Sequence, residues 1–264
     1  MVLPILEGGM DYGKLAGHYF DLLNWWIDSD PSEVFAYGAL EKYGENGPFR
    51  GQSCRNCNFK TECDFYWDIN KDKRSMDLYV QNEKYDGYIR DNCLFRKDIN
   101  IYDKMSAQVK YKNDVVLNYS LTTYSPFEGW RVAFNGTEGR LEARLDIPYE
   151  KSVNINQAEM HANEMDQTSQ EEDKYEPIFV HKLWKDYEVV KVPFTRAGHG
   201  GGDVALHDKI FKNPESSDPF GRSAGIRDGV MSVLIGIAAR KSIESGDPIK
   251  IAELTELQPR EKRL

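Results

Sequence analysis

The sequence lacks the features of several large classes of protein. Its 264 residues contain no run of about 20 apolar residues, so none of it predicts a membrane-spanning helix. The apolar stretch at residues 1–6 is followed by Glu7 and two glycines, and it is far too short for the core of a signal peptide. The 34 basic residues are outnumbered by 43 acidic ones, which leaves no excess of positive charge for the phosphates of nucleic acid. We therefore expect a cytoplasmic protein that binds neither membrane nor nucleic acid.

The glycine-rich phosphate loop of dinucleotide-binding domains is also missing. No G-x-G-x-x-G pattern follows a predicted strand, and the glycines of residues 198–202 come late, after a strand that belongs to a series of hairpins. Glycine permits positive φ and close approach of backbones, so this run fits a turn that presents His199 and Asp203. We expect the chain alone to hold no dinucleotide tightly.

Helical patterns lie near both ends of the chain. Residues 17–27 carry apolar side chains on most sides and are followed by residues that stop helices, which predicts a largely buried helix. On it, His18 and Asp21 are three residues apart and share a face. Two further helices are expected at residues 204–211 and 223–244, the second with an apolar stripe at helical spacing.

Between these helices the sequence predicts strands. A first strand at residues 33–40 precedes an irregular loop over residues 43–67. Three hairpins are expected, with strand pairs at 105–111 and 115–122, at 130–134 and 139–145, and at 178–184 and 187–193. The polar residues 154–176, between the second and third hairpins, predict a mobile surface insertion rather than a binding element.

These elements predict one α+β domain over residues 1–264. Successive hairpins build a large, mainly antiparallel open sheet with helices packed on one face, and no Rossmann domain is present. A chain of this length with 40% hydrophobic residues can bury one large core. The other face of the sheet meets water or a second copy, and the 15 tyrosines and 5 tryptophans favour the second copy.

Several motifs occur in the order found in one known family. They are His18-Tyr19-Phe20-Asp21, Gly38-Ala39-Leu40 before Cys54-Arg55-Asn56-Cys57, Phe134-Asn135-Gly136-Thr137-Glu138-Gly139, His199-Gly200-Gly201-Gly202-Asp203, the helix from Ser223, and Gly246-Asp247-Pro248-Ile249. The ordered set resembles the C-terminal, substrate-side domain of the glucose-fructose oxidoreductase and inositol dehydrogenase (Gfo/Idh/MocA) family. The resemblance covers nearly the whole chain.

The resemblance implies an NAD(P)-dependent oxidoreductase that acts on a sugar, a cyclitol or a related polyol. It implies a homo-oligomer that assembles through the open face of the sheet. It also implies that a Rossmann domain, in the parent protein or in a partner chain, provides the NAD or NADP site.

The family uses a histidine at the start of this helix to handle the proton of the substrate hydroxyl, and His18 matches it. Imidazole suits the task because it exchanges protons near neutral pH. Many members carry an acidic residue four positions before this histidine, where this chain has Lys14. A lysine can bind a hydroxyl or act as an acid or base, but it cannot orient His18 as a carboxylate would. Substrate contacts are implied for Tyr19, His199 and Asp203. The residues alone equally allow His18 as a core histidine and Asp203 as a helix N-cap.

The four cysteines form a candidate site of a different kind. Cys54, Cys57 and Cys63 are spaced C-x2-C-x5-C, and Cys93 follows at a distance. Such a set can offer four thiolates to a structural zinc ion or to an iron–sulfur cluster. The spacing is tighter than in paired zinc knuckles, and reduced thiols in a cytoplasmic protein need no metal, so free thiols and disulfides stay open as alternatives.

Two functions remain open at this point. In the first, the chain is the substrate-binding half of an NAD(P)-dependent oxidoreductase, inactive alone, and its nucleotide-binding domain is missing from this chain. In the second, it is a non-catalytic polyol-binding or assembly module that has lost the cofactor domain. Residues 1–10 are too few for the strand that precedes the catalytic helix in the family, so we expect a truncated chain and favour the first function.

Overall fold

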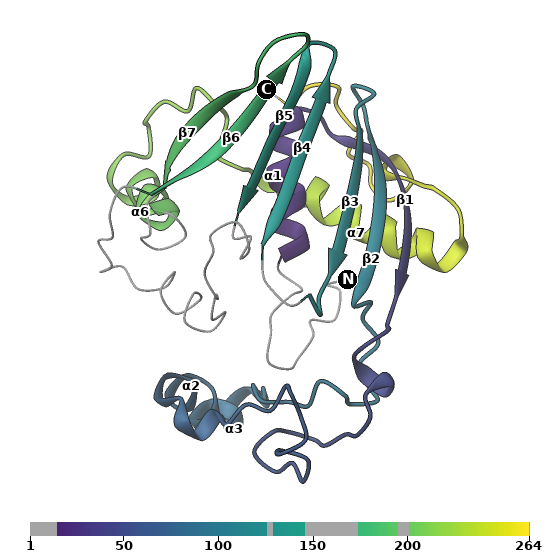
Figure 1. Cartoon of the computed structure of the whole chain (residues 1–264), viewed down its shortest axis with the longest axis vertical. Coiled ribbons are helices and arrows are strands. Elements are labelled where there is room, and N and C mark those ends of the chain that lie inside the picture. The colour runs from purple at the N-terminus through teal and green to yellow at the C-terminus, as the bar shows by residue number, and fades with distance from the viewer. Residues whose placement is uncertain (1–14, 126–128, 146–173, 195–200, 264) are drawn as a thin grey trace. The chain divides into compact units, whose positions relative to one another are not determined.

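The computed structural model describes residues 15–125, 129–145, 174–194 and 201–263 (Figure 1). The chain divides into two compact units, a first unit of Met1–Tyr124 with Asp218–Leu264 and a second unit of Ser125–Ser217. Each unit contains one four-stranded antiparallel sheet. The predicted α+β class is therefore confirmed, and the strands are distributed over two sheets where one large sheet was expected.

The sheet of the first unit has the order β3-β2-β1-β8. Its strands are β1 (Pro31–Ala39), β2 (Lys104–Tyr111), β3 (Val116–Thr122) and β8 (Ile249–Lys250). Val34 pairs with Val109, and Ala36 pairs with Ala107, so these four side chains share one face. All four are at most 5% exposed. The alternating polar residues of β2 are exposed, which confirms the predicted wet and covered faces.

Helix α1 (Leu15–Ile27) packs on the covered face of this sheet. The ring of Phe20 lies 4.7 Å from that of Tyr119 on β3, and the hydroxyl of Tyr111 on β2 donates a hydrogen bond of 2.8 Å to Asn24. Asn24 is 1% exposed, so this buried amide has its oxygen satisfied by the sheet. The helix begins and ends close to its predicted bounds.

Helix α7 (Ile226–Ser245) lies against β1. The backbone N–H of Ala36 donates to Ser242 Oγ at 3.0 Å, which satisfies a strand amide from the helix. A Cβ on Gly38 would lie 2.7 Å from Cδ1 of Ile243, so strand and helix approach closely here and a larger residue would make the Ile243 side chain move. The helix ends at Gly246, whose φ is 80°, as the glycine cap predicts. It is followed by a 3-10 turn, η6 (Ile251–Glu253).

The second unit contains a sheet of order β4-β5-β6-β7. Its strands are β4 (Trp130–Gly136), β5 (Gly139–Leu145), β6 (Lys174–Lys182) and β7 (Glu188–Phe194). Both hairpins predicted in this part of the chain are confirmed. Strand β6 begins within the last three residues of the predicted insertion at 154–176, and the insertion's residues 154–173 lie outside the described residues. The predicted helix at 204–211 is α6 (Gly202–His207) followed by a π-helical turn, η5 (Asp208–Lys212).

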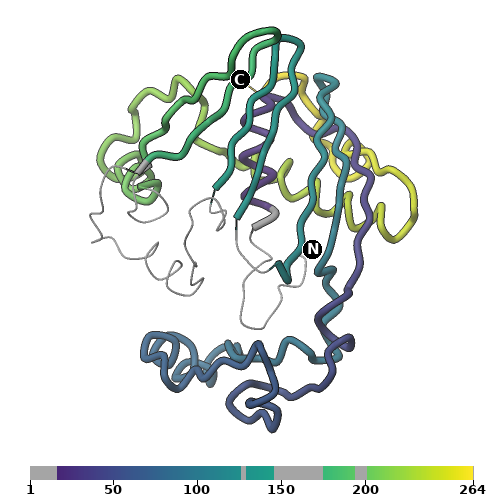
Figure 2. The backbone as a smooth tube through the Cα atoms, in the orientation of Figure 1, coloured from purple at the N-terminus to yellow at the C-terminus, as the bar shows by residue number. Residues whose placement is uncertain are grey.

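Residues 40–103, here called the cysteine segment, connect β1 to β2. Figure 2 traces it in the blue part of the colour scale as a run with little regular structure. It contains η1 (Gly44–Asn46), η2 (Ile69–Lys71), α2 (Lys73–Leu78), η3 (Val80–Asn82) and α3 (Glu83–Asp86). The fully buried carboxylate of Asp103 accepts backbone hydrogen bonds of 2.7–2.9 Å from residues 41–43, so both ends of the segment are joined. No described helix of the chain is both long and apolar enough to cross a membrane.

Candidate functional site

His18 lies in the first turns of α1 with its side chain exposed. The residues of α1 that face the sheet, Phe20, Leu23 and Asn24, are each at most 7% exposed. His18 is on the opposite side of the helix. The alternative of a core histidine is therefore wrong, and the imidazole is open to a bound molecule.

The start of α1 is anchored on both sides of His18. The hydroxyl of Ser232 on α7, 3% exposed, donates to the carbonyl of Gly17. Tyr19 is half-buried and lies near Tyr119, whose pKa is raised by burial first and by the neighbouring Tyr19 second. These contacts fix the backbone that carries His18.

Asp21 is a charged residue that interacts with His18. Burial raises the pKa of Asp21, and the negative charge of Asp228 raises it further. The positive charge of Arg263 and the interaction with His18 lower the pKa, but the net shift is upward. The guanidinium of Arg263 lies 3.9 Å from the Asp21 carboxylate. The carboxylate therefore interacts with His18 from the helix face that sequence analysis predicted the two residues to share.

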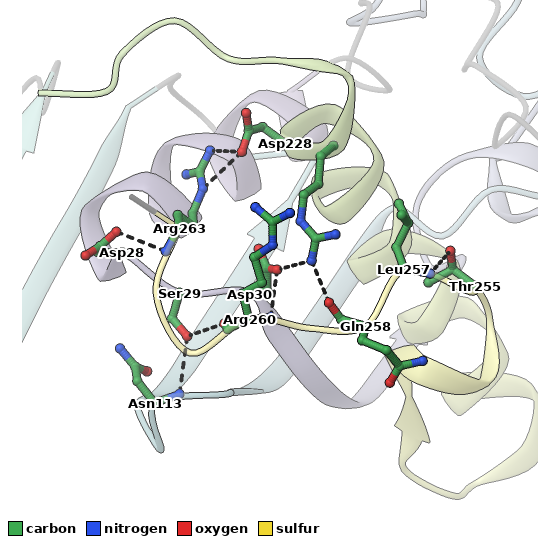
Figure 3. A network of polar contacts seen from close by, with 11 residues as sticks. Asp28, Ser29, Asp30, Asn113, Asp228, Thr255, Leu257, Gln258, Arg260 and Arg263 are labelled. Atoms are coloured by element: carbon green, nitrogen blue, oxygen red, sulfur yellow. Dashed lines mark hydrogen bonds and ion pairs between the residues drawn. The ribbon is translucent and has the colours of Figure 1, made fainter. Parts of the chain in front are cut away.

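Sequence analysis missed the cluster of charges that holds the other end of α1 (Figure 3). Asp30, 2% exposed, accepts hydrogen bonds from Arg227 at 2.6 Å and from the backbone of Arg260 at 2.8 Å. Arg263 binds Asp228 at 2.6 Å. The chain after α7 is thus tied back to α1 and to the start of α7. No local pattern signals this, because the partners are between 35 and 230 residues apart.

Of the other predicted substrate residues, Tyr19 is next to His18 on α1. Lys14 and His199 lie outside the described residues. Asp203 belongs to the second unit and lies half-buried in the first turn of α6. The N-cap of this helix is Gly201, whose φ is 86°. The alternative of Asp203 as the N-cap is therefore wrong. A shallow hollow follows Asp203 on the same helical stretch, lined by Val204, His207, Asp208, Phe211 and Lys212.

The described residues lack the strand–helix–strand unit on which Rossmann domains bind a dinucleotide. Every strand pair among them is antiparallel, so this part of the chain has no parallel strand–helix–strand unit to hold a pyrophosphate. Gly201, the described glycine of the 198–202 run that has positive φ, opens a helix of only six residues. We therefore assign no nicotinamide contact to these residues.

All four cysteines are free thiols and partly buried. Burial raises the pKa of Cys54 and that of Cys63. Among the residues that the structure describes, no three or more His, Cys, Asp or Glu side chains converge closely enough to enclose a metal ion. The thiols as placed therefore do not support the alternative of a structural zinc site.

Comparison with known proteins identifies the family. Residues 6–251 match the Gfo/Idh/MocA family, described as "Oxidoreductase family, C-terminal alpha/beta domain". The chain is 31% identical over 273 residues to YteT of Bacillus subtilis (strain 168), a protein named as an oxidoreductase, and the match covers 96% of this chain and 58% of YteT.

Two solved structures extend the comparison. An oxidoreductase domain protein from Kribbella flavida aligns with a TM-score of 0.50 at 11% identity, over 90% of this chain and 50% of its own. The aldose-aldose oxidoreductase from Caulobacter crescentus, complexed with glycerol, aligns with a TM-score of 0.45 at 11% identity, over 89% of this chain and 45% of its own. The chain thus spans about half the length of the proteins it matches. It belongs to the Gfo/Idh/MocA oxidoreductase family and corresponds to that family's C-terminal alpha/beta domain.

Proposed function

We propose that this chain is the substrate-binding part of an NAD(P)-dependent oxidoreductase that acts on a hydroxyl group of a sugar, a cyclitol or a related polyol. Its family membership supports the reaction class. The observation that carries the proposal is His18, exposed on a helix whose start is anchored by Ser232. The nicotinamide, which takes hydride when it is bound, is proposed to sit in a dinucleotide-binding domain outside the described residues.

In this proposal His18 accepts the proton of the substrate hydroxyl. When an alcohol becomes a carbonyl, the O–H proton needs a base, and imidazole serves at neutral pH. The carboxylate of Asp21 interacts with His18 from the same helix face. Asp21 is therefore proposed as a positioning residue for His18.

The remaining substrate contacts are proposed from the family resemblance. Tyr19 is next to His18 on α1, and its hydroxyl suits a polyol oxygen. Lys14 can donate to a substrate hydroxyl, and His199 and Asp203 can bind further hydroxyl groups. These assignments depend on the proposed function, and polyol binding by single variants tests each of them.

We also propose that the protein forms a homo-oligomer through an open sheet face. In the second unit Val190 and Val192, which share one face of β7, are 47% and 40% exposed, and Trp184 is 99% exposed. Apolar surface of this kind on a sheet favours contact with another protein surface.

The test of the catalytic role uses the protein that carries both this chain and a dinucleotide-binding domain, or the two parts mixed. Sugars and cyclitols are offered with NAD+ or NADP+, and reduced nicotinamide is followed by absorbance. We expect His18→Ala to lower kcat by about 100-fold or more, because a general base contributes this much. It should also abolish the fall in rate at acid pH, where imidazole is protonated.

The matched control is His181→Ala, an exposed histidine of β6 with no proposed role, which should leave kcat unchanged. Unchanged turnover in His18→Ala would contradict the catalytic assignment. Polyol binding measured by calorimetry, with no turnover on any nicotinamide cofactor, would instead identify the non-catalytic binding module.

A further inference from the structure

The last described residues, 258–263 and here called the tail, run against the turn that joins α1 to β1 (Figure 3). The N–H of Asp30 donates to the carbonyl of Arg260 at 3.0 Å, and the N–H of Arg260 donates to Asp30 Oδ2 at 2.8 Å. The hydroxyl of Ser29 donates to the same carbonyl at 3.3 Å. The tail lies beyond residues 6–251, which match the family model, so the family match gives it no role.

Arg227, in the first turn of α7, also binds the tail. Its guanidinium donates one hydrogen bond of 2.6 Å to Asp30 and another of 2.6 Å to the carbonyl of Gln258. The tail is thus joined to α7 through the first residues of that helix and to α1 through the turn that follows it. Hydrogen bonds are directional, so these contacts fix where the tail lies on both helices.

Arg263 joins α7 to α1 directly. Its guanidinium donates to Asp228 Oδ1 at 2.6 and 3.2 Å, and it lies 3.9 Å from Asp21 Oδ1. Its backbone N–H donates to the carbonyl of Asp28 at 3.3 Å. The side chain of Arg263 is 10% exposed, so salt screens its charge little. One buried cation therefore connects the first turn of α7 with the middle of α1 and with the turn after α1.

Asp21, the carboxylate on α1 that is near Arg263, lies about one helical turn from His18. Burial raises the pKa of Asp21, and the positive charge of Arg263 opposes this rise. The Oδ1 atom of Asp21 is buried and accepts no hydrogen bond from the described residues. Its interaction with Arg263 is therefore an ion pair without a hydrogen bond, and it depends on the charge at position 263.

The ion pair with Arg263 acts on a different side of α1 from the contacts with the sheet. On the side of the sheet, α1 is held by the burial of Phe20 and Leu23, which is non-directional, and by the hydrogen bond of Asn24. The ion pair acts on the face that carries His18, and it restricts rotation and sliding of the helix there. A displacement of about 1 Å at a reacting group can cost about 100-fold in rate, so a proton acceptor depends on such a restraint.

We propose that the tail positions the candidate catalytic site and that Arg263 is its positioning residue. By joining Asp228 of α7 to Asp21 of α1, Arg263 holds α1 in the position in which His18 meets the hydroxyl of the polyol. Arg263 acts through α1 and is assigned no contact with substrate or cofactor. This role rests on the proposed function of His18 as the proton acceptor.

The test compares variants of the protein that carries both this chain and a dinucleotide-binding domain. Arg263→Gln keeps a hydrogen-bond donor for Asp228 and removes the charge near Asp21. We expect it to lower kcat by about 10-fold or more and to leave KM for the polyol within about twofold, because alignment of the proton acceptor counts in the transition state. Arg263→Lys restores the charge and should recover most of the lost kcat.

The matched control is Arg240→Gln, which breaks an exposed ion pair of α7 with Glu244 and should leave kcat unchanged. Circular dichroism verifies that each variant is folded. A folded Arg263→Gln protein with unchanged kcat overturns the role of the tail. A higher KM at unchanged kcat does so too, because Arg263 would then contribute to binding alone, and so does a loss that Arg263→Lys fails to recover.

A second variant decides the question if Arg263→Gln fails to fold. Asp228→Asn weakens the hold of α7 on Arg263 and keeps an acceptor for the N–H of Gly225. The same fall in kcat is expected, and unchanged kcat contradicts the role of the tail. His18→Ala separates this role from the proposed function. Unchanged turnover in His18→Ala removes both, whereas a loss there without a loss in Arg263→Gln removes the role of the tail alone.

Discussion

The two sheets of the molecule use similar residues but bury them to different extents. Val34 and Val109 in the first sheet are fully buried, whereas Val189 and Val190 in the second are 43% and 47% exposed. None of the described residues of the second unit is buried. Alternating apolar residues are thus enough to form strand pairs, but burial requires a layer such as α1 and α7. The exposed sheet is the one for which we propose a partner copy.

The ion pairs of the two units also differ in how far their side chains are exposed. In the first unit the ion pair of Asp30 and Arg227 has side chains that are 3% and 22% exposed. In the second, Lys182 and Glu188 are 50% and 59% exposed. A buried carboxylate that loses its partner is left uncompensated, while an exposed one is solvated by water. The first unit should therefore depend on its ion pairs, and the second should not.

The largest effect is expected from Arg227→Ala. It leaves the buried carboxylate of Asp30 with only the backbone N–H of Arg260, and should lower the free energy of unfolding by about 3 kcal/mol. Urea denaturation followed by circular dichroism measures the change. Lys182→Ala is the counterpart in the second unit and should leave the midpoint unchanged. Equal losses in the two variants would show that the exposed pair is shielded in solution.

A smaller loss of stability is expected when the same valine-to-alanine change is made in each of the two sheets. Val109→Ala removes fully buried methyl groups and should cost about 2 kcal/mol in the free energy of unfolding. Val190→Ala, at a half-exposed position, should cost about 0.5 kcal/mol or less. The same urea titrations compare them. A cost at Val190 that matches the cost at Val109 would mean that the second sheet is covered in the native assembly.

Sequence analysis predicted the elements that local signals specify. The hairpin around Asn135 and Gly136 and the glycine cap of α7 were identified because turn and cap residues act over a few positions. The two short helices of the cysteine segment were missed. Asp72 caps the first of them by accepting from the Ser75 amide at 3.1 Å, a D-x-x-S pattern that a search for N-caps could have found.

The rest depended on contacts between distant parts of the chain. The division into two sheets is decided by strand pairing that no single hairpin reveals. At the candidate site, His18 was found from the family motif, but the interaction of Arg263 with Asp21 joins residues 242 positions apart. The N-cap of α6 is Gly201 and not Asp203, because the chain enters this helix with positive φ, which glycine adopts without strain.

The smallest effect concerns carboxylates whose pKa is lowered by different partners. Backbone N–H groups of Arg222 and Ser223, at 3.0 and 2.7 Å, lower the pKa of Asp218 in the first unit to about 2. The side chain of Lys182 lowers the pKa of Glu188 in the second unit. In both cases the folded state favours the charged form. The stabilisation is therefore complete above the pKa of the unfolded chain, about 4, and is lost as the pH falls through the folded value.

Salt should separate these two carboxylates. At 1 M salt the Debye length is about 3 Å, so the attraction between the exposed charges of Lys182 and Glu188 is screened. Short hydrogen bonds from backbone amides to Asp218 are not removed by screening. NMR titration at low and high salt should move the pKa of Glu188 back toward its ordinary value and leave that of Asp218 low. Equal movement of both would show that long-range charge, rather than the amide contacts, sets the pKa of Asp218.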